Sequence, residues 1–149
     1  MARFIYRMQS ILDIKEKLEE QARMEFATAK VRLNEEEEKL QILKERKLSY
    51  EEQGRELQKN GLNVREIIEN RNAIERMKEL IERQIQMVKL AQIQADEAAE
   101  RLKVAMQESK THIKLKEKAF TEFLQEENKR EAKEVDELTS YTYGQKIVK

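Results

Sequence analysis

Apolar residues recur at alternating steps of three and four along most of the chain, and this heptad repeat constrains the fold more than any other feature. A repeat of about 3.5 residues sustained over many turns predicts α-helices that wind around each other in a left-handed coiled coil. The two rows of the first half are Ile5, Leu12, Glu19, Phe26, Leu33, Leu40, Lys47 and Gly54, and then Met8, Lys15, Ala22, Ala29, Glu36, Leu43, Tyr50 and Leu57. The second half has Ile67, Ile74, Ile81, Val88, Ala95, Leu102, Ser109, Lys116 and Phe123, with Met77, Ala91, Ala98, Ala105, His112 and Ala119 on its companion row.

The composition agrees with long helices and not with a thick globular core. The 149 residues include no proline and three glycines, so little interrupts a helix. Charged residues make up 40% of the chain, against about 25% in ordinary soluble domains. Disordered chains share this charge but lack apolar periodicity. The sequence therefore predicts an all-α fold.

One short segment predicts a turn between two helices. Asn60 and Gly61 form a turn dipeptide, and Asn63 followed by Glu66 predicts an N-cap. So short a connection makes the two helices antiparallel. We therefore expect a single long antiparallel two-helix coiled-coil hairpin, one domain over 1–149, with the second helix longer than the first. Its expected parts are helix one at about 4–59, the turn at 60–62, helix two at about 63–140 and a C-terminal tail at 141–149.

The turn also sets a register. If Lys59 lies beside Val64, residue i faces roughly residue 123 − i, so that large residues meet large ones and small residues meet small ones. Gly54 lies inside helix one, where glycine costs about 1 kcal/mol relative to alanine, and we expect it to fray or kink the last turn. The register sets Ala22, Ala27 and Ala29 opposite 91–99. It leaves the chain after about Ala119 without a partner in helix one, and this overhang carries Phe120, Phe123, Val135 and Leu138.

Residues that could carry chemistry are better explained as parts of a rod. The run at 35–38 is four glutamates on a solvated helix face, and a two-helix rod lacks the desolvated pocket that catalytic carboxylates need. His112 is the single histidine and cysteine is absent, so no converging set of metal ligands is expected. No glycine-rich phosphate loop is present. We expect a protein that binds other proteins, with no catalysis, no cofactor and no metal.

The charge balance bears on partners and location. Thirty acidic and thirty basic residues cancel, whereas nucleic-acid binders carry a net positive face. Asp13, Lys15 and Glu16 interrupt the apolar N-terminal residues, which argues against a secretory signal. No apolar stretch approaches the ~20 residues of a membrane span. We expect a soluble cytoplasmic protein with no nucleic-acid partner and no transmembrane segment.

Aromatic residues gather where both ends of the expected hairpin meet. Two interpretations stay open: the rings plug the open end, or they form a docking tip together with Arg3 and Arg7. The aromatic residues concerned are Phe4, Tyr6, Phe120, Phe123, Tyr141 and Tyr143.

The two ends of the chain carry distinctive motifs: Phe4-Ile5-Tyr6-Arg7, Ile11-Leu12-Asp13-Ile14-Lys15-Glu16, Leu115-Lys116-Glu117-Lys118, Phe123, Glu127, Arg130-Glu131, Lys133 and Asp136-Glu137. In these residues the chain resembles a known family, the flagellar export protein FliJ as found in Gram-positive bacteria. The similarity extends over the whole chain, including Ala22, Ala29 and the turn at Gly61. It departs at the start of the second helix, where the family often has tyrosines and this chain has Asn70, Asn72 and Ile74.

The resemblance implies a soluble component of the flagellar type III export apparatus that is similar to the central stalk of a rotary ATPase. Such a protein would bind and stimulate the hexameric export ATPase, contact the cytoplasmic part of the export gate and escort substrate chaperones. It would lie at the inner face of the cell membrane at the flagellar base. The expected ATPase-binding tip consists of Phe4, Tyr6, Arg7, Phe123, Glu127, Arg130, Glu131, Asp136 and Glu137.

Three other functions fit the same pattern. A stalk subunit of another rotary or secretion ATPase would have the same architecture. Only the motifs at the ends of the chain distinguish it from a flagellar export protein. A structural coiled-coil scaffold would carry a second apolar face, while the charged seam residues Glu19, Lys47 and Lys116 favour one defined register. A membrane-surface protein would use the basic N-terminus, against which the acidic residues from Asp13 onward argue.

Overall fold

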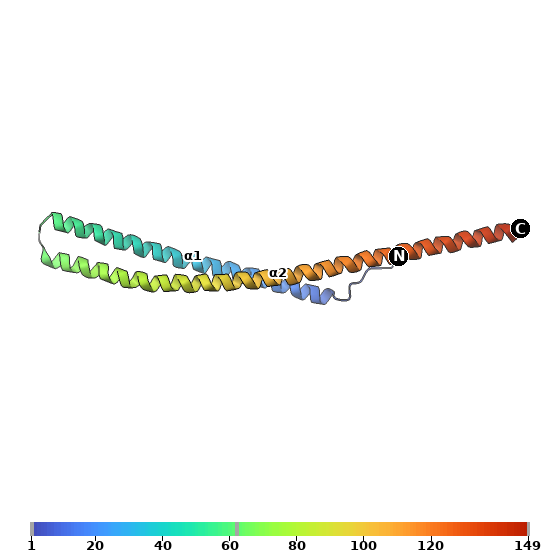
Figure 1. Ribbon diagram of the computed structural model, residues 1–149, viewed down its shortest axis with the longest axis horizontal. Helices are drawn as coiled ribbons and strands as arrows, with labels where there is room; N and C mark the ends of the chain where they lie inside the picture. The colour runs from blue at the N-terminus through green and yellow to red at the C-terminus, as the bar shows by residue number, and fades with distance from the viewer. Residues whose placement is uncertain (1, 62, 149) are drawn as a thin grey trace. The chain divides into compact units, whose positions relative to one another are not determined.

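The structure is a computed structural model that describes residues 2–61 and 63–148, with the side chains of 146–148 left out. Its ordered elements over those residues are two helices, α1 (Gln9–Lys59) and the longer α2 (Val64–Val148). They run antiparallel and pack against each other as a hairpin (Figure 1), which confirms the predicted fold class. Neither helix, over the residues described, contains a stretch apolar enough to cross a membrane.

The chain divides into two compact units. The turn unit consists of Glu20–Lys103, and the terminal unit consists of Met1–Glu19 with Val104–Lys149. Each unit contains a segment of both helices, so each has a seam of its own. The interpretation of the whole chain as one domain stays a prediction.

The seam of the turn unit follows the predicted heptad rows. In α1, every position of both rows from Ala22 to Leu57 is buried or half-buried, and the corresponding rows of α2 are covered in the same way. Leu33, Ala91 and Ala95 form the buried centre, with Ala29 and Val88 packed against it. Ala91 and Ala95 are buried there with Ala29 packed against them, so that small residues meet small ones, as the register predicted. Ala27 is the exception: it is exposed because it lies between the rows, on the solvent face.

The turn begins and ends where the sequence predicts. α1 ends at Lys59, Gly61 has a φ of 111°, and the Asn63 side chain accepts a hydrogen bond from the Glu66 amide at 3.4 Å. The positive φ suits glycine, which has no Cβ to clash in that region. This bond confirms the predicted N-cap. Leu62, the last residue of the predicted turn, lies outside the described residues.

Two boundaries, the start of α1 and the end of α2, differ from the sequence-based expectation. α1 begins at Gln9 and not near residue 4, because the preceding chain turns away from the heptad path, with the Gln9 amide bonded to the Tyr6 carbonyl at 3.2 Å. The expected seam residue Ile5 is accordingly 77% exposed. α1 runs through Gly54 without a break. The segment expected as a tail from Tyr141 is helical to Val148, since it contains no proline that would end a helix.

Candidate functional site

The N-terminal segment, residues 2–8, is attached to α2 by aromatic contacts in the terminal unit. The Phe4 ring lies edge-on to Phe120, with centroids 5.2 Å apart and planes at 69°, and 5.4 Å from Phe123. Such tilted aromatic pairs add about 0.5–1.5 kcal/mol beyond the area they bury. Phe4, Tyr6 and Phe123 are half-buried, and Arg7 is exposed. The contacts fit the plug interpretation for Phe4, Phe120 and Phe123 only, since Tyr141 and Tyr143 lie on the exposed part of α2.

A short seam lies beneath this segment. Leu12 and Ser109 are each 2% exposed, and the Lys15 ammonium donates to the Glu108 carboxylate at 3.0 Å. The positions of this ion pair sum to 123, the value predicted from the turn. His112 lies on the same seam, where its Nδ1 is buried and has no hydrogen-bond partner among the described residues. The terminal unit therefore has the predicted register.

The second half of the predicted tip lies on an exposed helix. Glu127 is half-buried and accepts from Arg130 at 3.1 Å, and every side chain from 128 to 145 is exposed. α1 begins at Gln9 and gives this part of α2 no partner, as predicted, while Phe4 of the N-terminal segment packs on Phe120 and Phe123. The fully exposed part of the overhang therefore begins after Glu127. Arg130, Glu131, Asp136 and Glu137 share this exposed segment.

The structure therefore brings together part of the predicted tip. Phe4 and Phe123 are in contact, and Tyr6 and Arg7 belong to the same anchored segment. Sequence reasoning named Val135 and Leu138 as apolar residues of the overhang but did not join them to their neighbours in a shallow surface hollow of about 340 Å³. It is lined by Val135, Leu138, Thr139, Thr142 and Tyr143. The signal was present in the spacing 135, 138, 142, which places these residues on one helix face.

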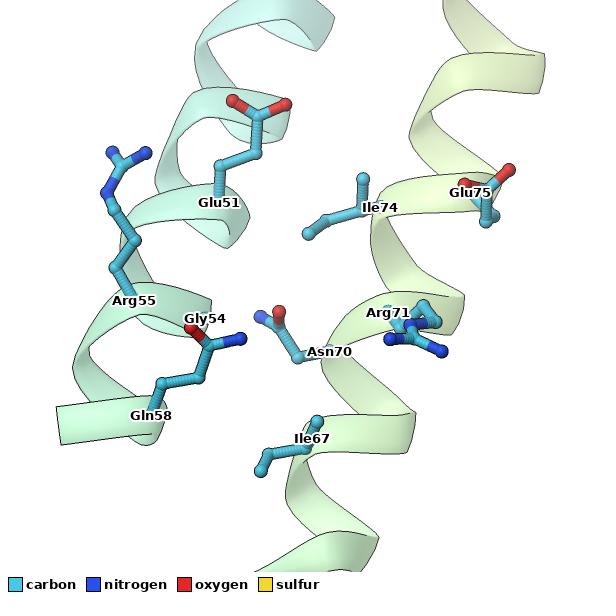
Figure 2. A pocket seen from close by; sticks show the side chains of 9 residues that line it. All are labelled: Glu51, Gly54, Arg55, Gln58, Ile67, Asn70, Arg71, Ile74 and Glu75. Carbon is cyan, nitrogen blue, oxygen red and sulfur yellow. The ribbon is translucent and has the colours of Figure 1, made fainter. Parts of the chain in front are cut away.

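In the turn unit, a polar contact crosses the seam near the turn (Figure 2). The Asn70 amide donates to the Tyr50 carbonyl at 2.8 Å and lies against Gly54, where a Cβ would stand 2.5 Å from the Asn70 oxygen. Ile67 and Ile74 point toward α1 on either side of it. The contact borders a pocket of about 220 Å³. Gly54 is thus required for the close approach of the Asn70 side chain.

A second polar contact lies at the middle of the turn unit. Glu36 is 7% exposed, and the Gln84 amide donates both to its carboxylate at 2.6 Å and to its backbone carbonyl at 2.8 Å. This hydrogen bond from Gln84 holds the pKa of Glu36 below its ordinary value of 4.5, against the opposing effect of burial, with smaller contributions from Lys39 and Arg32. Because the pair crosses the helices, it favours one register over its neighbours.

The residues that the structure describes contain no group of three or more His, Cys, Asp or Glu side chains placed to hold a metal ion. What the geometry shows is an N-terminal segment packed on α2 through Phe4, followed along α2 by an exposed helical segment with charged and apolar residues. These features belong to the terminal unit alone.

A solved structure shares this architecture. A solved structure described as a YscO homologue from Chlamydia trachomatis resembles the chain with a TM-score of 0.65 and 23% sequence identity, covering 96% of each chain, which shows the shared fold. None of the curated proteins matches the sequence. The model of the flagellar FliJ protein family matches residues 4–147. The chain therefore belongs to the flagellar FliJ protein family and is a component of the type III export apparatus.

Proposed function

We propose that this protein binds and stimulates the hexameric flagellar export ATPase in the manner of a rotary-ATPase central stalk, using its terminal unit. The binding residues would be Phe4, Tyr6, Arg7, Phe123, Glu127, Arg130, Glu131, Asp136 and Glu137. The same protein would contact the cytoplasmic part of the export gate and escort substrate chaperones from a position at the membrane face of the flagellar base. We expect no catalytic activity of its own.

The observation that carries the proposal is the exposed helix of residues 128–145 beside an anchored N-terminus. Every described side chain of that segment faces solvent, so none of them is needed to hold the hairpin together. The segment mixes ion-forming groups such as Arg130 with apolar ones such as Leu138, the combination that protein interfaces use. A long helix that enters a ring can meet several subunits at once from such a face.

The stalk analogy also assigns a role to the Phe4 contacts. Rings packed at 5.2 and 5.4 Å fix the N-terminal segment to α2, so both parts of the tip would enter the ATPase as one preformed surface. Preformed surfaces lose less side-chain and backbone entropy on binding. Phe4 would therefore act by positioning Tyr6 and Arg7.

The test is a pull-down with the cognate export ATPase, with hydrolysis measured on the same mixtures. A chain ending at Glu127 keeps the Phe4–Phe123 contact and removes the exposed helix, and we expect it to lose both binding and stimulation. The triple variant Arg130→Ala, Glu131→Ala, Asp136→Ala should weaken both.

A matched triple variant in the turn unit serves as the control, because it removes exposed side chains of the same kinds. The variant is Arg83→Ala, Glu82→Ala, Glu79→Ala, and it should behave as the unmodified chain does. Full binding and stimulation by the chain that ends at Glu127 would refute the assignment of the tip. Failure of the unmodified chain to bind would refute the ATPase proposal itself.

A further inference from the structure

Two polar side chains of α2 cross the seam of the turn unit in the same way. Asn70 donates its amide to the Tyr50 backbone carbonyl, and Gln84 donates its amide to the Glu36 backbone carbonyl, each at 2.8 Å. Helix carbonyls can accept such a second bond because each has two lone pairs. The donors are two heptads apart on α2, and the acceptors are two heptads apart on α1. Both bonds therefore belong to one alignment, in which residue i of α1 faces residue 120 − i of α2.

Each of these side chains also meets a feature of α1 that is specific to this alignment. Asn70 lies against Gly54, where a Cβ would stand 2.5 Å from its oxygen (Figure 2). Gly54 is the single glycine of α1, so no other position of that helix leaves the same space. Gln84 donates in addition to the Glu36 carboxylate at 2.6 Å, and Glu36 is buried. A slide of one helix along the other would separate both pairs.

The apolar seam beyond these contacts does not distinguish neighbouring alignments. Alanines occupy one heptad row on both helices, at Ala22 and Ala29 in α1 and at Ala91 and Ala98 in α2. A slide of one heptad would set Ala29 against Ala98, or Ala22 against Ala91, so that alanine again faces alanine. Because a single methyl group is replaced by another, these layers pack equally well in either alignment. The polar contacts therefore carry the discrimination in this part of the seam.

We propose that the Asn70 and Gln84 contacts act as a register lock, which holds α1 and α2 of the turn unit in one axial alignment and excludes those one heptad away. A buried polar side chain specifies register because a wrong alignment leaves it desolvated without its partner. A slide in either direction sets the Glu36 carboxylate against Met77 or Ala91, where it is buried beside an apolar residue. The lock does not depend on binding to the ATPase and is tested on the chain alone.

Pairs of engineered cysteines report the alignment directly, because the chain contains no cysteine of its own. Ala29→Cys with Ala91→Cys reports the observed alignment, since Ala29 packs against the cluster that contains Ala91. Ala29→Cys with Ala98→Cys and Ala22→Cys with Ala91→Cys report the alignments one heptad away in the two directions. One heptad is about 10.5 Å along a helix, beyond the roughly 7 Å between Cα atoms that a disulfide tolerates.

The experiment compares each cysteine pair with and without the lock. The lock is removed by the triple variant Glu36→Met, Gln84→Met, Asn70→Leu, which replaces both partners of the buried pair with apolar side chains of similar length. The initial rate of intramolecular disulfide formation is measured on non-reducing gels of dilute protein in a mild oxidant. With the lock, only the pair at 29 and 91 should form rapidly. Without it, we expect the rate of at least one shifted pair to rise about tenfold, the change in population that one unsatisfied buried polar group produces.

The triple variant should keep the helicity and urea midpoint of the unmodified chain, because exchanging both partners of a buried polar pair for apolar groups is close to neutral. Lys47→Leu with Glu51→Leu is the matched control: both are half-buried, and their ion pair of 3.4 Å lies within α1. It should leave the rates of all three pairs unchanged.

Two results overturn the proposal. One is a triple variant in which both shifted pairs stay as slow as in the unmodified background, since the turn and the apolar seam would then suffice to fix the alignment. The other is a triple variant that is unfolded without urea, since the contacts would then hold the fold itself. A control variant that speeds the shifted pairs as much as the triple variant overturns it as well, because any loss of seam polarity would then allow the slide.

Discussion

Replacing Gly54 by alanine tests how firmly Asn70 is held across the seam of the turn unit. An alanine Cβ at position 54 would stand 2.5 Å from the Asn70 side-chain oxygen, far inside van der Waals contact. The amide of that side chain donates to the Tyr50 carbonyl at 2.8 Å. Asn70 must therefore move to admit the methyl group, and the movement breaks its hydrogen bond (Figure 2).

The two effects of Gly54→Ala oppose each other. Alanine gains about 1 kcal/mol over glycine in a helix interior. Loss of the Asn70–Tyr50 hydrogen bond lowers the free energy of unfolding by about 1 kcal/mol, and residual crowding around the new methyl group lowers it somewhat further. Gly54→Ala alone should thus change the free energy of unfolding by about 0 to −1 kcal/mol. In an Asn70→Ala background the Asn70 side chain no longer blocks the new methyl group. Gly54→Ala should then raise the free energy of unfolding by about 1 kcal/mol.

The assay is urea denaturation followed by far-UV circular dichroism on the two single variants and the double variant. We expect a coupling free energy of about 1–2 kcal/mol between positions 54 and 70. Gly144→Ala is the control: it adds a methyl group that meets nothing within 4 Å, so its effect should be the same with Asn70 or Ala at position 70. Additivity of Gly54→Ala and Asn70→Ala within about 0.5 kcal/mol would refute the reasoning.

Three further predictions concern seam residues. Leu33→Ala should lower the free energy of unfolding by about 2–3 kcal/mol in urea denaturation, while exposed Val31→Ala changes it by less than about 0.5. The lowered pKa of Glu36 stabilises the fold above its ordinary value of 4.5, and this stability is lost as pH falls below it. Gln84→Met removes the hydrogen bond that mainly lowers the pKa of Glu36. Acid titration followed by circular dichroism should then show a smaller loss of stability at low pH than in the unmodified chain. His112→Leu should raise the Tm, because it removes a buried nitrogen that lacks a partner among the described residues; an unchanged or lower Tm contradicts this.

The seam, the cap and the register could be predicted because each depends on spacing along the chain. A heptad row specifies which side chains face the partner helix, and the short turn specifies which residues lie opposite. Leu33 beside Ala91 and Ala95 follows from those two facts alone. The Asn63 cap follows from local hydrogen-bonding chemistry within one helical turn.

The features that the sequence did not reveal depend on particular pairs of side chains far apart in the chain. In the heptad pattern, Gly54 and Asn70 are two seam positions without a large apolar side chain. They form a contact only because they lie opposite each other on the two helices. The start of α1 was misplaced for the same reason. Phe4 reaches Phe120 and Phe123, and this contact draws the first residues off the helical path that their periodicity predicts.

The stability of the exposed helix at 128–145 bears on the proposed binding of the ATPase. An isolated helix of about this length is marginal in water, and an exposed pair such as Glu127–Arg130 adds only about 0.2–0.5 kcal/mol. Burying Val135 or Leu138 against another surface contributes up to about 1.5–3 kcal/mol each, several times more than such an exposed ion pair. The segment therefore gains most of its helical stability when it is docked. Helix formation and the proposed binding of the ATPase are therefore coupled in this segment.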